Sequence, residues 1–216
     1  MSDQRIYWED GGAYRSTDHP VVTLFARQRV AHLRKRGALA GVRNFLDVGA
    51  GSGFSSIHYP PEIRVVACDY ARGMISTNPT RQRVRSAADR LPFEDRSFDA
   101  VSCWELLHHL EDPVGALREM WRVARKRVLV FEPNRIHPGH LFLGLTRKEE
   151  RASLRFSPGH VRRLLTAAGY PPPRIHERCG SLFPNITPLP LARMIYALPF
   201  RLPVIGISQL VIAEKS

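Results

Sequence analysis

Short apolar runs recur along the chain and alternate with segments whose apolar residues follow a helical repeat. Each run is bounded by glycine or polar residues, which is typical of strands that a parallel sheet buries on both faces. Two of the runs end in an aspartate, at Asp47 and Asp69. The pattern predicts strands at 43–48, 63–69, 98–105, 126–133 and 207–215, with a further short strand within 81–89.

Helical spacing is clearest in three segments. The first covers residues 21–40 and presents one face made of Val22, Phe25, Arg29 and Leu33. The other two begin at Asp112 and Ser157, each an N-cap residue followed by proline. Strands that alternate with helices predict βαβ units, and therefore an α/β fold with a doubly wound, mostly parallel sheet in one domain over residues 1–216.

Three segments lie outside this minimal sheet. Residues 1–40 are expected to form an N-terminal cap and helix, and residues 135–156 and 181–205 are long insertions. The ligand crevice of an α/β sheet lies beyond the carboxyl ends of its strands, so we expect the insertions to roof an acceptor site there.

The first connection between strands is unusually short. Ten residues separate Gly53 from Arg64, and two of them are prolines. The sheet face at this point would need cover from the N-terminal helix or from a second subunit. A homodimer is therefore one expectation.

The stretch "FLDVGAGSG", residues 45–53, carries the first chemical signal. No lysine follows its glycines, which excludes a P-loop, and Phe54 stands where a dinucleotide fingerprint has its last glycine. Asp47 would repel a pyrophosphate but suits a ligand that carries an ammonium group. Asp69 is placed to accept hydrogen bonds from a ribose diol, a role that NAD and S-adenosylmethionine (SAM) sites share.

Composition and charge leave the partner open. The chain is 44% hydrophobic and 24% charged, as in a globular protein, and its net charge is +12 with a pI near 10.4. Such a charge invites a nucleic-acid partner, but the arginines are scattered, which favours a solvated basic surface or an acidic small substrate. Three widely spaced cysteines and no apolar run of membrane-spanning length favour a cytoplasmic protein.

Four segments together resemble a known family: "FLDVGAGSG", "VVACDYARGMI", "AADRLPFEDRSFDAVSCWELLHHLEDPVGALREMWRV" and "RVLVFEPN". In order and spacing they are similar to the motifs of class I SAM-dependent methyltransferases, in the small-molecule branch that includes quinone-biosynthesis enzymes. The resemblance covers about residues 43–134, the expected SAM-binding core. It implies a seven-stranded Rossmann-like sheet flanked by helices.

The resemblance also implies the cofactor-binding residues: Asp47, Gly49, Ala50, Gly51, Gly53, Asp69, Tyr70, Ala88, Asp89, Arg90 and Trp104. Asp47 would act through the SAM ammonium or through the geometry of the glycine loop. Asp69 would take the ribose hydroxyls, and Asp89 would accept from the adenine amino group.

Candidate catalytic residues are His108, His109 and Glu132, which follow two adjacent predicted strands. One histidine could deprotonate an acceptor hydroxyl as a general base, or could instead be a packed core residue. His137 and His140 have weaker claims to the same role. No spacing of His, Asp or Glu indicates a metal site, so none is expected.

Three functions follow from these observations. The first is a SAM-dependent methyltransferase that acts at O, N or C of a small or lipid-like molecule. The second is an RNA or protein methyltransferase recruited by the basic surface, and the third is a catalytically inactive partner subunit with the same fold. Four roles are open for the apolar segment that contains Arg193 and Arg201. It could pack in the core, form a wall of the acceptor site, contact another subunit or rest on a membrane surface.

Overall fold

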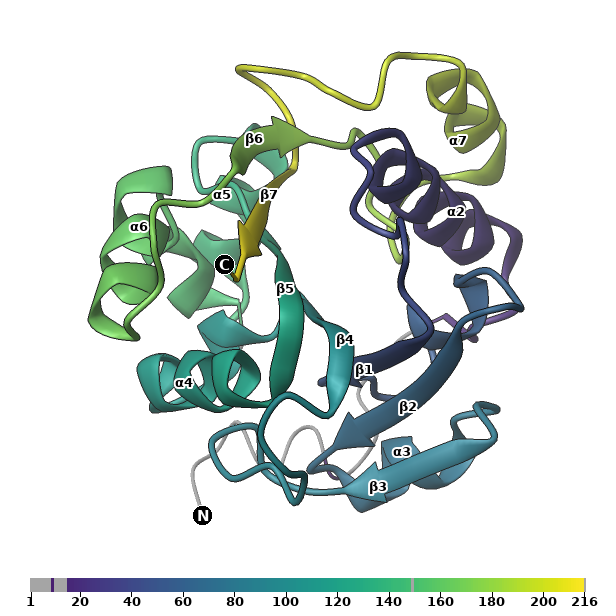
Figure 1. Ribbon diagram of the computed structural model, residues 1–216. Helices are drawn as coiled ribbons and strands as arrows, with labels where there is room; N and C mark the ends of the chain where they lie inside the picture. Colours follow the sequence, from purple (N-terminus) through teal and green to yellow (C-terminus); the bar gives the residue numbers. More distant parts are fainter. Residues whose placement is uncertain (1–8, 10–14, 149, 216) are drawn as a thin grey trace.

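A computed structural model describes residue 9, residues 15–148 and residues 150–215 (Figure 1). A seven-stranded sheet has the order β3-β2-β1-β4-β5-β7-β6. Its strands are β1 (Asn44–Val48), β2 (Arg64–Asp69), β3 (Gln82–Arg85), β4 (Phe98–Trp104), β5 (Ala124–Pro133), β6 (Ile175–Cys179) and β7 (Ser208–Glu214). β7 is antiparallel to both of its neighbours, and the other adjacent pairs are parallel. The predicted mostly parallel, seven-stranded sheet is confirmed.

The strand missing from the sequence-based prediction is β6. Its residues, "IHERC", are largely polar and half-buried, and β7 is the one named strand with which it pairs in the described sheet, at the sheet's edge. An edge strand of this composition lacks the apolar run by which buried strands are recognised. The start of the predicted N-terminal cap, residues 1–8 and 10–14, lies outside the described residues.

Helices form a layer on each face of the sheet (Figure 1). α4 (Pro113–Val123) and α6 (Pro158–Ala167) cover one face, and their predicted caps Asp112 and Ser157 accept from backbone N–H groups. α2 (Pro20–Lys35) covers the other face, and α7 (Leu189–Tyr196) packs against α2. Residues 15–148 and 150–215 also contain α3 (Arg72–Thr77), α5 (Pro138–Thr146) and the 3₁₀ turns η1 (Ser56–His58), η2 (Leu107–His109) and η3 (Arg151–Arg155).

The short first crossover contains only η1 among the elements between β1 and β2. Val30 and Leu33 of α2 pack in one buried cluster with Phe45 and Tyr59, whose ring centroids are 4.2 Å apart. The N-terminal helix therefore covers this part of the sheet, the first of the two expected solutions. The homodimer stays a prediction.

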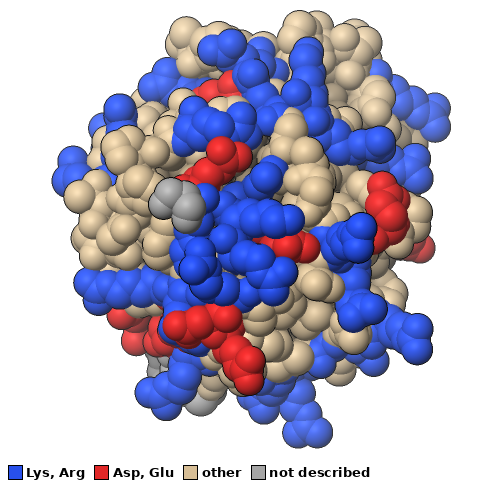
Figure 2. Space-filling view, viewed as in Figure 1, with Lys and Arg blue, Asp and Glu red and all other residues tan. Residues whose placement is uncertain are grey.

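Lys and Arg gather on the face where β7 ends (Figure 2). Arg43, Lys126 and Arg174 belong to this face, because they precede or begin parallel strands. Acidic groups neutralise part of it: Lys126 Nζ lies 3.2 Å from Asp99 Oδ1, and Arg174 Nε lies 3.1 Å from Glu214 Oε1. This basic face is at the edge opposite the carboxyl ends of the parallel strands.

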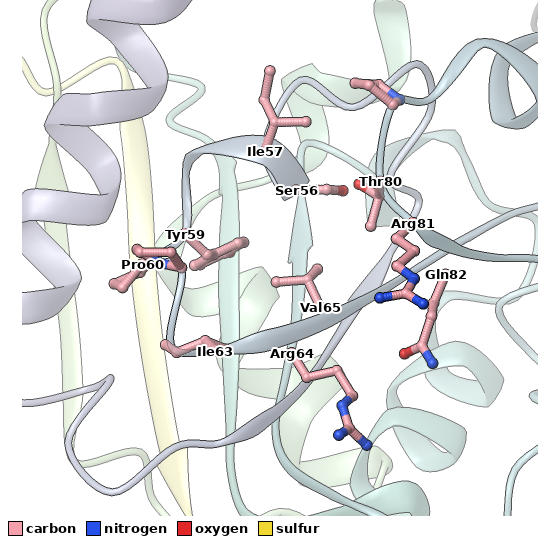
Figure 3. A pocket seen from close by; sticks show the side chains of 12 residues that line it. Ser56, Ile57, Tyr59, Pro60, Ile63, Arg64, Val65, Thr80, Arg81 and Gln82 are labelled. Carbon is pink, nitrogen blue, oxygen red and sulfur yellow. The ribbon is translucent and has the colours of Figure 1, made fainter.

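A groove of about 700 Å³ borders the short crossover. Figure 3 shows Tyr59, Pro60 and Ile63 along one side and Thr80, Arg81 and Gln82 along the other. The described residues that line it include no carboxylate, histidine or cysteine, so we assign no chemistry to the groove. Every helix in the described segments is too short or too polar to cross a bilayer.

Candidate active site

A pocket of about 460 Å³ opens at the carboxyl ends of β1, β2 and β4. One wall is the loop that follows β1, and the floor includes the ends of β2 and β4. The opposite wall comes from α5 and from residues 182–186, which belong to the two long insertions. Adjacent parallel strands of a doubly wound sheet create such a crevice because their following loops diverge to opposite faces.

The glycine loop approaches the pocket with a backbone that side chains would obstruct. Gly51 has φ +48°, and a Cβ there would lie 2.8 Å from Met74 Cε. Gly53 has φ +99°, and its Cβ would lie 2.8 Å from Pro79 Cδ. Asn78 holds the loop from the side, since its Nδ2 donates to the Gly51 carbonyl at 2.9 Å. The loop thus needs glycine for its conformation as well as for space.

Asp47 supports this loop from beneath and does not line the pocket. It is fully buried, and its carboxylate accepts hydrogen bonds from the hydroxyls of Ser55, Ser56 at 2.6 Å and Ser102 at 3.0 Å. Burial raises the pKa of Asp47, against the effect of the three hydroxyl donors. The structure therefore places Asp47 where it can act through loop geometry, one of the two roles expected for it.

Asp69 lies in the pocket at the end of β2. Its Oδ2 accepts from Gly51 N and its Oδ1 from Ala71 N, each at 2.8 Å. Burial raises its pKa, although these backbone donors oppose the shift. The carboxylate has about four acceptor positions and three backbone donors, from Gly51, Ala71 and Tyr70, so it keeps an acceptor position for a ligand hydroxyl.

The pocket brings together most residues that the resemblance assigned to the cofactor. Those that line it are Gly49, Ala50, Gly51, Asp69, Tyr70, Ala88, Asp89 and Trp104. Asp47, Gly53 and Arg90 do not line it. Gly53 shapes the loop through its positive φ, whereas Arg90 is exposed to solvent.

Behind the pocket, Glu132 organises the turn after β4. It is fully buried and accepts from the backbone N–H groups of Leu106 at 3.0 Å and Leu107 at 2.7 Å. Its other oxygen, Oε2, lies 2.8 Å from Nδ1 of His108. His108 and His109 line the pocket, but Glu132 does not. Glu132 therefore orients His108 and can reach a ligand only through it.

The histidines near the pocket differ in protonation. Burial would lower the pKa of His108, but the carboxylates of Glu132 and Glu150 outweigh it and raise that pKa to about 10. Burial lowers the pKa of His140 to about 4, and burial together with His108 lowers that of His109 well below 6.5. At neutral pH the site thus combines an imidazolium at His108 with neutral imidazoles at His109 and His140.

Glu150 was not singled out from the sequence, because it belongs to an insertion far from β4 along the chain. Its Oε2 lies 3.8 Å from His108 Nε2, and the nearby histidines outweigh the effect of burial and lower its pKa to about 2. One ligand atom each from His108, His109 and Glu150 lie within 4.8 Å of one another. No spacing in the sequence indicated this compact cluster of polar side chains.

Arg29 and Glu105 form a second polar pair that sequence spacing did not reveal. Arg29 is 1% exposed and donates through Nη2 to Glu105 and Ser208. Its guanidinium carbon lies 4.1 Å from the centroid of Phe25, and its Nη1 has no partner among the described residues. Glu105 has φ +54°, a strained backbone of the kind that clusters at functional sites. The signal available beforehand was a charged residue on the apolar face of the first predicted helix.

Comparison with known proteins agrees with this geometry. Residues 46–131 match the family model described as a methyltransferase domain. Demethylmenaquinone methyltransferase of Beutenbergia cavernae is 40% identical over 102 residues, which is 45% of this chain and 42% of that protein. The enzyme of the same name from Renibacterium salmoninarum is 40% identical over 94 residues, 41% of this chain and 39% of its own. The chain thus spans less than half the length of these relatives.

Solved structures share the fold at low identity. A possible histamine N-methyltransferase from Thermotoga maritima has a TM-score of 0.69 and 18% identity, covering 91% of this chain and 92% of its own. The plantazolicin methyltransferase BpumL, solved with S-adenosylhomocysteine (SAH), has a TM-score of 0.62 and 13% identity, covering 92% and 86%. Residues 46–131 therefore form a methyltransferase domain that is similar to quinone-biosynthesis enzymes, and the chain has the fold of solved SAM-dependent methyltransferases.

Proposed function

We propose that this protein transfers a methyl group from SAM to a lipid-like hydroxyaromatic acceptor. The observation that carries the proposal is the composition of one pocket. It joins the glycine loop and Asp69 on one side to an apolar wall made by Leu143, Leu182 and Phe183 on the other. The first side suits a nucleoside cofactor and the second suits an apolar acceptor.

The residues present fit SAM. Asp69 offers carboxylate lone pairs to a ribose diol, Asp89 and Tyr70 lie where an adenine would extend, and the glycine loop leaves room for a backbone approach. Arg29 supplies a buried nitrogen without a partner among the described residues, which a methionine carboxylate could occupy.

SAM supplies, when bound, a methyl group activated by the positive charge on sulfur. The chain then has to orient the acceptor and exclude water from it. Leu106 and Leu110 belong to the pocket lining beside the histidines, and the two insertions form its outer wall. These groups can seal the reacting atoms from solvent.

Proton handling falls to the histidines. A hydroxyl proton of the acceptor can pass to a neutral imidazole, and His109 and His140 both remain neutral at pH 7 because their pKa values are lowered. The imidazolium of His108 can stabilise the resulting aromatic oxyanion. In this scheme His109 is the general base, His108 the electrostatic partner and Glu132 the group that positions His108.

The acceptor class is inferred from the relatives and the pocket wall. The curated relatives carry the name demethylmenaquinone methyltransferase, and an apolar wall of the kind found here suits a prenylated ring. For this chain we propose only the chemical class of the acceptor, which is a hydroxyaromatic ring with an apolar substituent.

The other two functions are less well supported. The basic surface that Figure 2 shows lies at the opposite edge of the sheet from the pocket, so an RNA bound there would lie away from the methyl group. A catalytically inactive subunit has no need for pocket carboxylates such as Asp69. A cytoplasmic location stays part of the proposal, supported by three free, buried cysteines.

The test has two stages. Calorimetric titration with SAH measures cofactor binding, and transfer of labelled methyl from SAM to reduced, prenylated and unprenylated naphthoquinols measures activity. We expect SAH to bind and His109→Gln to lower kcat by about 10²–10⁴-fold without weakening SAH. SAH binding without transfer to any quinol would refute the acceptor class. A folded protein that does not bind SAH would refute the enzyme.

A further inference from the structure

The exposed apolar side chains have a strongly uneven distribution. Within the described part of the chain, large hydrophobic residues that are exposed belong to residues 136–145 and 186–205, with Ile57 as the exception. Phe142 is 64% exposed, Leu145 65% and Met194 67%. The others are Ile136, Leu141, Ile186, Leu191, Tyr196, Leu198, Val204 and Ile205. Scattered exposed apolar residues are normal, but a concentration of this kind marks an interaction site.

The two segments that carry these side chains both follow the carboxyl edge of the sheet. α5 follows the carboxyl end of β5, and residues 181–205 follow the carboxyl end of β6, which is parallel to β5. The two segments also touch, since the Phe183 ring centroid lies 5.4 Å from that of His137 and 5.3 Å from that of His140. We call this surface the rim, because the same two segments form the outer wall of the active-site pocket.

Helix α7 carries apolar side chains that the core does not bury. Ala192 is its buried residue and packs with α2, while Leu191 and Met194 remain exposed. In α5, Phe142 and Leu145 likewise point away from the pocket, whose lining includes His140 and Leu143. Each helix therefore presents a second apolar surface to the outside.

Basic residues predominate on the rim. Residues 135–156 and 181–205 contain seven basic residues, Arg135, Arg147, Lys148, Arg151, Arg155, Arg193 and Arg201, against two acidic ones, Glu149 and Glu150. All seven basic residues are exposed, and Glu150 is turned inward to His108. Exposed apolar residues ringed by arginines are typical of helices that lie in a membrane interface, where the arginines reach the head groups.

We propose that the rim docks on an anionic lipid bilayer, with Phe142, Leu145 and Met194 inserted at the level of the acyl chains. The inference rests on the proposed function in one respect: docking would bring a lipid-like acceptor from the bilayer to the pocket. A second copy of the chain fits this surface less well, because a two-fold contact would set seven basic residues against the same seven.

Binding to vesicles tests the proposal directly. The protein is sedimented with vesicles of phosphatidylcholine alone and with vesicles that contain phosphatidylglycerol. We expect binding to the anionic vesicles, and a drop of about tenfold or more in affinity for Phe142→Ser/Leu145→Ser and for Met194→Ser. Ile57→Ser is the matched control, because Ile57 is an exposed apolar residue outside the rim.

A spectroscopic measurement distinguishes insertion of the rim into the bilayer from electrostatic attraction of vesicles to the basic face. An environment-sensitive dye on Leu145→Cys should shift to the blue on anionic vesicles, whereas the same dye on Ile57→Cys should not. Equal vesicle affinity in the rim variants, or no wild-type binding, overturns the proposal. A dimer in sedimentation that the rim variants dissociate would also overturn it in favour of a contact between copies.

The two proposals fail in distinguishable ways. The rim variants change no residue that lines the pocket, so their calorimetric SAH affinity should equal that of the wild type. Loss of vesicle binding with SAH binding intact supports the rim. Vesicle binding by a protein that does not bind SAH would refute the proposed function and leave docking standing.

Discussion

His108 Nδ1 lies 2.8 Å from Glu132 Oε2, and the pair joins the turn after β4 to the end of β5 beneath the pocket. Both side chains are almost or completely buried. The negative charge of the buried Glu132 carboxylate stabilises the protonated form of the His108 imidazole, so His108 keeps its proton at neutral pH. The pair thus fixes both the shape of the turn and the charge at the pocket wall.

Stability should depend on this proton. The pKa of His108 in the folded protein is about 10, above its usual value of 6.5, so its contribution is complete below pH 6.5. That contribution is lost as the pH rises toward 10. Urea unfolding between pH 7 and 10 should show wild-type stability falling, and His108→Gln should flatten the dependence. Parallel curves for the two proteins would contradict the shift.

Cofactor affinity should depend on Asp69. Asp69→Asn keeps the shape but removes the charge that accepts a ribose hydroxyl, which we expect to weaken SAH binding by about 10–100-fold. The measurement is calorimetric titration at neutral pH. Glu62→Gln, an exposed carboxylate outside the pocket, is the control and should bind as the wild type does.

Asp47 should contribute both to the stability of the fold and to the affinity for SAH. In Asp47→Asn the amide nitrogen cannot accept the serine hydroxyls, and we expect a loss of about 1–3 kcal/mol in the free energy of unfolding. SAH affinity should fall too, since the loop rests on these hydrogen bonds. Glu62→Gln, at an exposed residue outside the pocket, should alter neither. Weaker binding with unchanged stability would instead favour direct contact with the ammonium.

The pair Arg29–Glu105 should show strong coupling. Arg29→Met leaves Glu105 without its main partner at the pocket and should cost about 3 kcal/mol of unfolding free energy. Adding Glu105→Gln should recover part of that loss, which a double-mutant cycle measures. Arg34→Met, on the exposed side of the same helix, is the control. Strictly additive effects would mean that the two residues stabilise the protein separately.

Gly53 should tolerate no side chain. A Cβ would meet Pro79 at 2.8 Å in a backbone of φ +99°, so Gly53→Ala should cost about 1–3 kcal/mol and weaken SAH. Gly159→Ala is the matched control, because its nearest neighbour would be 3.9 Å away in a helical backbone. Thermal unfolding should show the control unchanged or slightly stabilised.

The sequence by itself determined the parallel strands of the core and the pocket residues at their carboxyl ends. Buried strands need continuous apolar runs, and helix caps need particular side chains, so both are visible locally at β1, β2, β4 and β5 and at Asp112 and Ser157. The glycine loop and Asp69 follow from the same local logic, because they belong to strand ends. β6 was missed, since an edge strand has no such run.

Only the tertiary structure decided which distant residues share the site. Arg29 and Glu105, or His108 and Glu150, meet because the insertions and α2 fold over the carboxyl edge of the sheet. It also decided that Asp47 lies beneath the loop and that His108 is protonated while His109 is neutral. Burial and the distance between charges set these properties, and both depend on packing between segments that are far apart along the chain.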